Sequence, residues 1–239
     1  MGELVSYRLV EGVATIGMDD GKANALSLAM IAAVNGALDR AEADGAVVIL
    51  TGRPGIFAGG FDLRVLGAGG PDAAQMLEEG FLLALRVLEH PAPVVVAGNG
   101  HAVAMGLFLL LSGDYRLGVD GPFRLVANEV AIGLTMPQAA IEICRQRLAP
   151  AHFHRVVVLA ETYAPSDGVG AGLLDQVVGE PDLQPSAEAL ATAMAQLDRT
   201  AHAATKALAR RSSVAAIRHG LDHDREVFAL LREAPTGGG

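Results

Sequence analysis

Hydrophobic and polar residues follow three different patterns in the first 66 positions of the chain. Residues 5–20 alternate between apolar and polar and contain a Glu11–Gly12 pair, which predicts a β-hairpin. Residues 24–44 place apolar side chains at helical spacing, and Ser27 stands where it would cap the helix. The continuous apolar run at 45–52 ends in glycine and predicts a strand buried on both faces. A glycine-rich turn at 55–66 then leads into a helix that is predicted to begin near Asp62.

Strand and helix patterns continue to alternate until about residue 180. An amphipathic helix is predicted over 72–91, stopped by Pro91, followed by strand, turn and helix over 92–114 and two short strands at 115–119 and 123–130. The glycine-rich stretch 67–73 is expected to be a mobile loop. This alternation predicts an α/β fold. We therefore divide the chain into a mixed core, 1–180, and a helical C-terminal region, 181–239, whose last five residues are expected to be disordered.

Composition excludes several classes of function. The net charge of −9 gives no basic excess to neutralise phosphates, so a nucleic-acid partner is not expected. The apolar run 102–111 is shorter than the roughly 20 residues that cross a bilayer, and no signal-peptide pattern opens the chain. A lone cysteine, Cys144, excludes an internal disulfide and is predicted to be a core thiol. These features predict a soluble cytoplasmic protein without a membrane partner. Only 19% of the residues are charged, which suggests that other subunits cover part of the surface.

Two strand-to-helix turns carry the candidate chemistry. The stretches "FAGGFDL" at 57–63 and "GHAVAMGL" at 100–107 each bring small residues and exposed backbone to the start of a helix. Free N–H groups at a helix start carry partial positive charge, and two that converge on one oxygen form an oxyanion hole. Tight packing between strand and helix selects the same small residues and remains the alternative.

Five stretches along the chain resemble the crotonase superfamily, the enoyl-CoA hydratase/isomerase family. They are "GKANAL", "FAGGFDL", "NGHAVAMG", "SGDYRL" and "NEVAIGLTMP", and they occur in the family's order and approximate spacing. The resemblance implies a ββα spiral core with a helical C-terminal region that builds homotrimers, often paired into homohexamers. It also implies an acyl-CoA substrate whose thioester carbonyl lies between two backbone N–H groups, with coenzyme A as part of the substrate and no further cofactor.

The same resemblance assigns the binding positions. It places the oxyanion donors at the backbone N–H groups of Gly59 and Met105. The segment that would pass along the acyl-CoA consists of Gly60, Phe61 and Asp62. Ala25 is the expected contact near the adenine and pantetheine, and the Met105 side chain would narrow the acyl pocket.

The chain differs from the family's hydratases at one acidic position. Those hydratases use two glutamates: one matches Glu129, whereas the other falls on Phe108, which is placed in the substrate pocket. A single glutamate is typical of the family members that shift a double bond from the 3- to the 2-position of a fatty acyl-CoA. The chain is therefore predicted to be such an isomerase of fatty acid metabolism. The alternatives are a hydratase with a non-standard second acid, taken from His101 or Asp114, and an acyl-CoA-binding protein that has lost its catalytic activity.

The surroundings of Glu129 lead to a further expectation. Apolar neighbours should raise the pKa of its carboxyl, because burial disfavours the charged form. Asn128 is expected either to bond the loop or to orient the acid. The apolar neighbours are Phe108, Val130, Ile132 and Leu134.

The remaining polar residues have structural explanations. Glu142 is expected to pair with Arg145 or Arg147, and His101 and Asp114 are interpreted as structural residues. His152 and His154 have the spacing of metal ligands but lack a third ligand at a suitable distance, so no metal site is predicted. Lys206 or Arg210 is the candidate cation for the coenzyme's phosphates.

Overall fold

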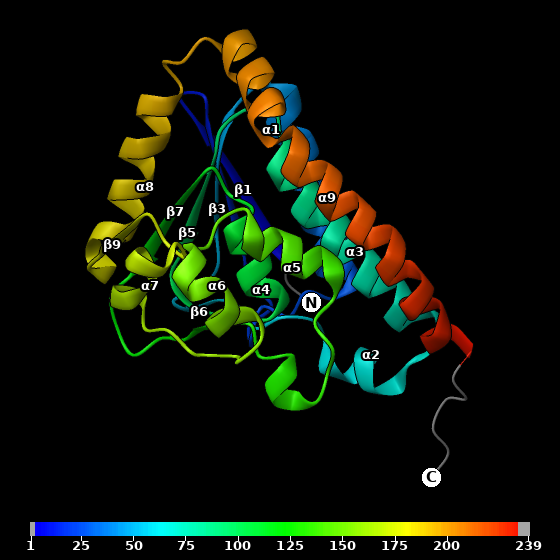
Figure 1. Ribbon diagram of the computed structural model, residues 1–239. Coiled ribbons are helices and arrows are strands. Elements are labelled where there is room, and N and C mark those ends of the chain that lie inside the picture. The colour runs from blue at the N-terminus through cyan, green and yellow to red at the C-terminus, as the bar shows by residue number, and fades with distance from the viewer. Residues whose placement is uncertain (1–2, 234–239) are drawn as a thin grey trace.

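The computed structural model describes residues 3–233, which form two β-sheets surrounded by helices (Figure 1). The larger sheet has six strands in the order β1-β2-β3-β5-β7-β9, and the smaller has three in the order β4-β6-β8. Among the strands of residues 3–233, β1 and β2 form the only antiparallel pair. The strands are β1 (Val5–Val10), β2 (Val13–Met18), β3 (Val47–Thr51), β4 (Gly55–Ala58), β5 (Val94–Gly98), β6 (Gly100–Val103), β7 (Tyr115–Val119), β8 (Leu125–Val126) and β9 (Gln176–Val178).

Successive strands go alternately to the two sheets. From β3 onward the chain adds β3, β5 and β7 to the large sheet and β4, β6 and β8 to the small one. The helices are α1 (Leu28–Asp44), α2 (Leu63–Ala68), α3 (Gly70–Glu89), α4 (Met105–Leu111), α5 (Gln138–Arg145), α6 (Pro150–Val157), α7 (Pro165–Ala171), α8 (Glu180–Met194) and α9 (Arg199–Glu233), with a 3₁₀ turn at Val130–Ile132. This repeat confirms the predicted α/β fold and its ββα spiral.

Local sequence signals account for the element boundaries nearest the site. The predicted hairpin pairs Val10 with Val13 around the Glu11–Gly12 turn. The Ser27 side chain accepts a hydrogen bond from the Met30 N–H, so this residue caps α1 as expected. Asp62 does the same for α2 by accepting from the Arg64 N–H.

Two predicted boundaries are wrong. The stretch 67–73 is not a loop, because α2 continues to Ala68 and α3 begins at Gly70, leaving Gly69 between them. Gly69 has φ +66° and ψ −154°, a backbone conformation in which glycine ends one helix and starts the next. The stretch 92–114 also contains a second strand, β6, which separates β5 from α4.

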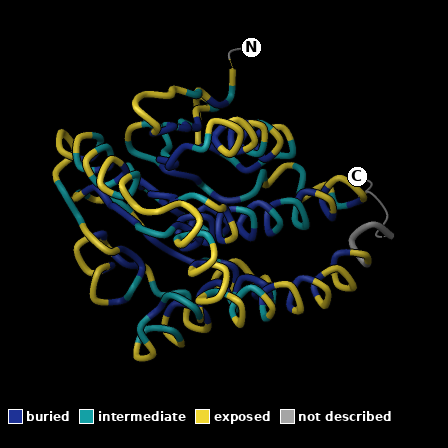
Figure 2. Tube along the Cα trace, turned by 90° about the horizontal axis from the view of Figure 1, so that it is seen from above, coloured by how far each residue is buried: buried dark blue, intermediate teal, exposed yellow. Residues whose placement is uncertain are grey.

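The C-terminal helix α9 lies along the molecule beside α3 and α5 (Figure 1). Its helical structure is as predicted, and the five-residue tail lies outside the described residues. The inner faces of the helices and the strands between them are buried (Figure 2). Within residues 3–233, no helix is both long and apolar enough to cross a membrane.

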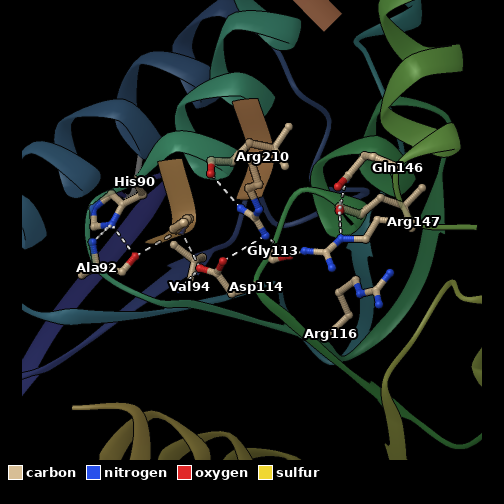
Figure 3. A network of polar contacts seen from close by, with 12 residues as sticks. His90, Ala92, Val94, Gly113, Asp114, Arg116, Gln146, Arg147 and Arg210 are labelled. Atoms are coloured by element: carbon tan, nitrogen blue, oxygen red, sulfur yellow. Dashed lines mark hydrogen bonds and ion pairs between the residues drawn. The ribbon is translucent and has the colours of Figure 1, made fainter. Parts of the chain in front are cut away.

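A buried polar network fixes α9 to the core (Figure 3). Asp114, which follows α4, accepts hydrogen bonds from the Val94 N–H at 2.7 Å and from Lys206 Nζ at 2.6 Å, and it pairs with Arg210 at 2.9 Å. Arg147 donates to the carbonyl of Gly113, next to Asp114. Lys206 and Arg210 are therefore committed to this internal contact and are not free to bind phosphate, so that part of the prediction is wrong.

Candidate active site

Glu129 is a buried carboxylate at the end of the small sheet. Its side chain is only 8% exposed, and its Oε2 atom has no hydrogen-bond partner among the described residues. The 3₁₀ turn that follows is closed by bonds from the Ile132 and Leu134 N–H groups to the Glu129 carbonyl, at 3.1 and 2.9 Å. Burial raises the pKa of Glu129 to about 7, as the sequence predicted. The carboxyl is therefore suited to both accept and release a proton near neutral pH.

The residues that bury Glu129 are not its neighbours in sequence. Val130, Ile132 and Leu134 are 44%, 53% and 50% exposed, so their expected role in raising the pKa is wrong. The Glu129 charge instead acts on Cys144, a fully buried thiol of α5 whose pKa is raised by burial and by that charge. The short 3₁₀ turn thus directs the glutamate inward and the three apolar side chains outward.

Phe108 is the residue that the resemblance matched to the second glutamate of the hydratases, and it lies in the interior. It lies on α4, is 1% exposed, and stacks on Phe81 with ring centroids 6.3 Å apart. The two alternative groups named from the sequence have partners elsewhere. His101 accepts a hydrogen bond from the Arg124 N–H at 2.9 Å, and Asp114 belongs to the network that fixes α9.

Asn128 has a buried side-chain oxygen, Oδ1, that also lacks a hydrogen-bond partner among the described residues. Asn128 and Glu129 together therefore present two unpaired buried oxygens at consecutive positions. Unpaired buried polar atoms are rare in folded proteins and are often explained by an unbound ligand or by catalysis. This pair makes the end of β8 the candidate for the reactive part of the core.

The turn after β4 corrects one predicted oxyanion donor. The N–H of Gly59 donates to the carbonyl of Ala23 at 2.9 Å, so it is not free to bind a substrate oxygen. The peptide between Gly60 and Phe61 differs, because its carbonyl, that of Gly60, accepts from the Leu26 N–H at 2.8 Å. In a trans peptide the N–H points opposite to the carbonyl. The N–H of Phe61 therefore points away from Leu26.

Met105 supplies the second free N–H at this point. As the first residue of α4 it has no acceptor within the helix. Within residues 3–233, no backbone carbonyl accepts a hydrogen bond from Phe61 or Met105. A Cβ atom placed on Gly60 would lie 3.2 Å from the Val103 carbonyl and 3.7 Å from the Met105 nitrogen. The two turns thus meet at Gly60, and the N–H groups of Phe61 and Met105 lie on opposite sides of this contact, one on each turn.

Two features hold these turns together. Ala104 adopts φ +49°, a conformation that costs a non-glycine residue energy and that here orients the start of α4. Gly106 allows the helix to rest directly on β4, because a Cβ there would lie 2.2 Å from the Ala58 carbonyl. The small residues of both turns therefore serve tight packing as well as an exposed backbone, so the two explanations offered from the sequence are compatible.

A groove of about 580 Å³ opens beside this point. Among its lining residues are four that the sequence assigned to substrate or oxyanion binding: Ala25, Gly59, Phe61 and Asp62. Asp62 is also paired with Arg64 at 3.1 Å, which lowers the pKa of its carboxyl. The groove thus extends from the "GKANAL" segment to Phe61.

Two cations of this groove were not predicted from the sequence. Lys22 and Arg64 both line it, and the Arg64 side chain is 88% exposed. Lys22 lies within the "GKANAL" stretch, so its position could have been noticed, whereas Arg64 becomes visible only once α2 is placed. Both lie at the surface, whereas Lys206 and Arg210 are turned into the protein.

The histidines of α6 are part of a small polar contact. His152 Nδ1 lies 2.9 Å from the Tyr163 hydroxyl. In the part of the chain that the structure describes, no three His, Cys, Asp or Glu residues are grouped so that they could hold a metal ion. Glu142 pairs with Arg145 at 3.1 Å, as one of the two predicted partners.

Helix α9 also supports the loop that carries Glu129. The buried carboxylate of Asp224 accepts hydrogen bonds from the Gln138 and Ala139 N–H groups, both at 2.8 Å. These are the first two residues of α5, which has no cap of its own. Gly220 permits the close crossing, since a Cβ there would lie 2.9 Å from the Ala139 nitrogen. Asp224 therefore caps α5 from a distant part of the chain.

Replacing Asp224 by Ala is expected to destabilise the protein by about 1–3 kcal/mol, because two buried N–H groups lose their acceptor. Chemical denaturation would measure this change. Asp222→Ala is the matched control on the same helix, since its side chain is 66% exposed, and its effect should stay within about 0.5 kcal/mol. Equal stability of the two variants would show that the cap contributes nothing.

Comparison with known proteins places these features in a family. Residues 8–234 match the family model described as enoyl-CoA hydratase/isomerase. Human mitochondrial enoyl-CoA delta isomerase 1 is 28% identical over 223 residues, covering 91% of this chain and 74% of the relative. A probable enoyl-CoA hydratase of Mycobacterium leprae is 26% identical over 211 residues, covering 86% of this chain and 80% of the relative.

Solved structures agree on the fold. An enoyl-CoA hydratase/isomerase family protein from Pseudomonas syringae is 46% identical with a TM-score of 0.92, covering 93% of this chain and 97% of its own. An enoyl-CoA isomerase from Mycobacterium tuberculosis is 43% identical with a TM-score of 0.89, covering 93% of this chain and 97% of its own. The chain therefore belongs to the enoyl-CoA hydratase/isomerase family of the crotonase superfamily and is an enzyme of that family.

Proposed function

We propose that this enzyme converts 3-enoyl-CoA to 2-enoyl-CoA in fatty acid metabolism, with Glu129 as its single acid and base. The observation that carries the proposal is one buried carboxylate with an unpaired oxygen and a pKa of about 7, combined with an apolar Phe108 at the second acid position. Hydration of a double bond needs a group that activates water, and a phenyl ring has no such group. Moving a proton between two carbons needs only one carboxylate.

In the proposed reaction, ionised Glu129 removes a proton from C2 of the 3-enoyl thioester. The electrons of the C2–H bond form a dienolate, which places negative charge on the thioester oxygen. The same carboxyl then returns the proton to C4, so that the double bond ends between C2 and C3. No other reactant is consumed.

The dienolate charge would be stabilised by the N–H groups of Phe61 and Met105. Both are free of backbone acceptors and lie on the two turns that meet at Gly60. Preorganised donors in a site that excludes water stabilise such a charge strongly, typically by roughly 3–4 kcal/mol for each donor. Phe61 takes the role that the sequence assigned to Gly59, whereas Met105 keeps its assigned role.

The groove beside these groups is proposed to bind coenzyme A. Ala25, Gly60, Phe61 and Asp62 would lie along the thioester and pantetheine, and Lys22 and Arg64 would approach the phosphates. We also propose a homotrimer or homohexamer in the cytoplasm. Exposed apolar side chains at the start of the last helix and just before it, Leu208 and Leu197, support an assembly.

The test is to incubate the enzyme separately with 3-enoyl-CoA and 2-enoyl-CoA and to follow the products by mass spectrometry. We expect unchanged mass with a moved double bond from the 3-enoyl substrate. Rapid gain of one water by the 2-enoyl substrate would instead identify a hydratase. Binding of both without turnover would identify an acyl-CoA-binding protein that has lost its catalytic activity.

A further inference from the structure

The side chain of Phe61 separates the coenzyme groove from the interior. The residue lines the groove, and its ring meets the ring of Phe81 edge-on, with centroids 6.3 Å apart and an interplanar angle of 69°. Phe81 in turn stacks on Phe108 with a centroid distance of 6.3 Å. Phe81 and Phe108 are almost fully buried. The space directly behind the Phe61 ring is thus filled by a row of aromatic side chains.

A glycine of α3 provides the seat for the Phe61 ring. A Cβ atom on Gly80 would lie 2.4 and 2.5 Å from the Phe61 Cε1 and Cζ atoms and 3.6 Å from Met105 Cγ. Real Cβ atoms do not approach other atoms so closely, so the ring lies directly on the α3 backbone. The ring therefore lies against α3 at Gly80, where the Met105 side chain also approaches this helix.

From this arrangement we propose that the Phe61 ring, seated on Gly80, closes the acyl site and selects short acyl chains. The inference rests on the proposed function. The Phe61 N–H would bind the thioester oxygen, so its side chain begins only two bonds from that contact and lies beside the first carbons of the acyl group. A longer chain would have to displace the ring from Gly80 or pass around the aromatic row.

The experiment measures kcat/KM for 3-hexenoyl-CoA and 3-dodecenoyl-CoA. The wild-type enzyme is expected to prefer the shorter substrate. Phe61→Ala keeps the backbone N–H and removes the ring, and it should raise the dodecenoyl-to-hexenoyl ratio by roughly tenfold or more, since each added methylene in an apolar pocket changes discrimination severalfold. Gly80→Ala should raise the same ratio to a smaller extent, because its methyl group would overlap the ring and push it from its seat.

A matched control is Phe153→Ala, which removes a phenyl ring from α6 that packs against Arg145. Its ratio of kcat/KM for the dodecenoyl substrate to that for the hexenoyl substrate should equal the wild-type ratio. The proposal is overturned if Phe61→Ala and wild type give the same ratio, or if the wild type prefers the longer substrate.

Binding of saturated hexanoyl-CoA and dodecanoyl-CoA, followed by calorimetry, separates this inference from the proposed reaction. If no variant turns over either enoyl substrate, the isomerase proposal fails. The ratio of the two dissociation constants would still show whether removing the ring admits the longer chain. An unchanged ratio of dissociation constants in Phe61→Ala would contradict the selectivity inference by itself.

Discussion

Replacing Glu129 by Gln is expected to lower kcat for 3-enoyl-CoA isomerisation by roughly 10³-fold while acyl-CoA binding persists. Glutamine has nearly the same shape but cannot accept a proton from carbon at neutral pH. The two N–H groups of the proposed oxyanion hole come from the backbone and are unaffected. Steady-state kinetics and calorimetric titration with a saturated acyl-CoA would measure the two quantities separately.

The same substitution is expected to stabilise the folded protein above pH 7. The pKa of Glu129 rises from 4.5 to about 7 on folding, so between these values the folded state holds a proton that the unfolded state has released. The contribution of Glu129 to the free energy of unfolding therefore falls by about 3 kcal/mol at most as the pH increases through that window. Above the window it stays at this lower value. A neutral glutamine removes this cost, so a rise in Tm at pH 8 should accompany the loss of activity.

The pH profile of the wild type tests the same carboxyl. Since proton removal needs the ionised form, kcat/KM should increase with pH through about 7 and level off above it. Glu142→Gln is the matched control, because that glutamate pairs with Arg145 on the surface of α5. Full activity of Glu129→Gln on 3-enoyl-CoA would refute the single-acid mechanism.

Local signals explain why much of the fold was predictable. The Glu11–Gly12 turn, the Ser27 cap and the Asp62 cap depend on residues a few positions apart, and each appears where the sequence placed it. The prediction of a loop at 67–73 was wrong for a related reason. Glycine marks a break in a helix, but the sequence alone does not show whether the break is a loop or a single residue between two helices.

The site was less predictable because its properties depend on distant contacts. Whether the N–H of Gly59 is free depends on the carbonyl of Ala23, which lies 36 positions earlier in the chain. Whether Lys206 is free to bind a phosphate depends on its hydrogen bond to Asp114, a residue 92 positions earlier. The burial of Glu129 was correctly anticipated, but its apolar sequence neighbours are exposed, and the group on which its charge acts, Cys144, lies on α5. A motif therefore located the site to within a turn, while the fold determined which groups of that turn are available.

Gly60 offers the sharpest test of the corrected oxyanion hole. It has φ +94°, a conformation that side chains rarely adopt, and a Cβ there would lie 3.1 Å from the Ala104 Cβ and 3.2 Å from the Val103 carbonyl. Gly60→Ala should therefore push the turn away from α4 by a few tenths of an ångström. The Phe61 N–H would then no longer be aligned with the thioester oxygen. The expected result is a fall in kcat of roughly 10²-fold or more, as for the loss of one oxyanion donor.

Gly36→Ala is the matched control for this substitution. Gly36 lies within α1, and an added Cβ there meets no atom within 4 Å, so activity should be unchanged and Tm should rise slightly. The Gly60 variant should lose kcat on 3-enoyl-CoA while Glu129 keeps its pKa of about 7 in the pH profile, because the carboxyl itself is untouched. If Gly60→Ala folds and retains wild-type kcat, the free N–H groups of Phe61 and Met105 do not bind the reacting oxygen.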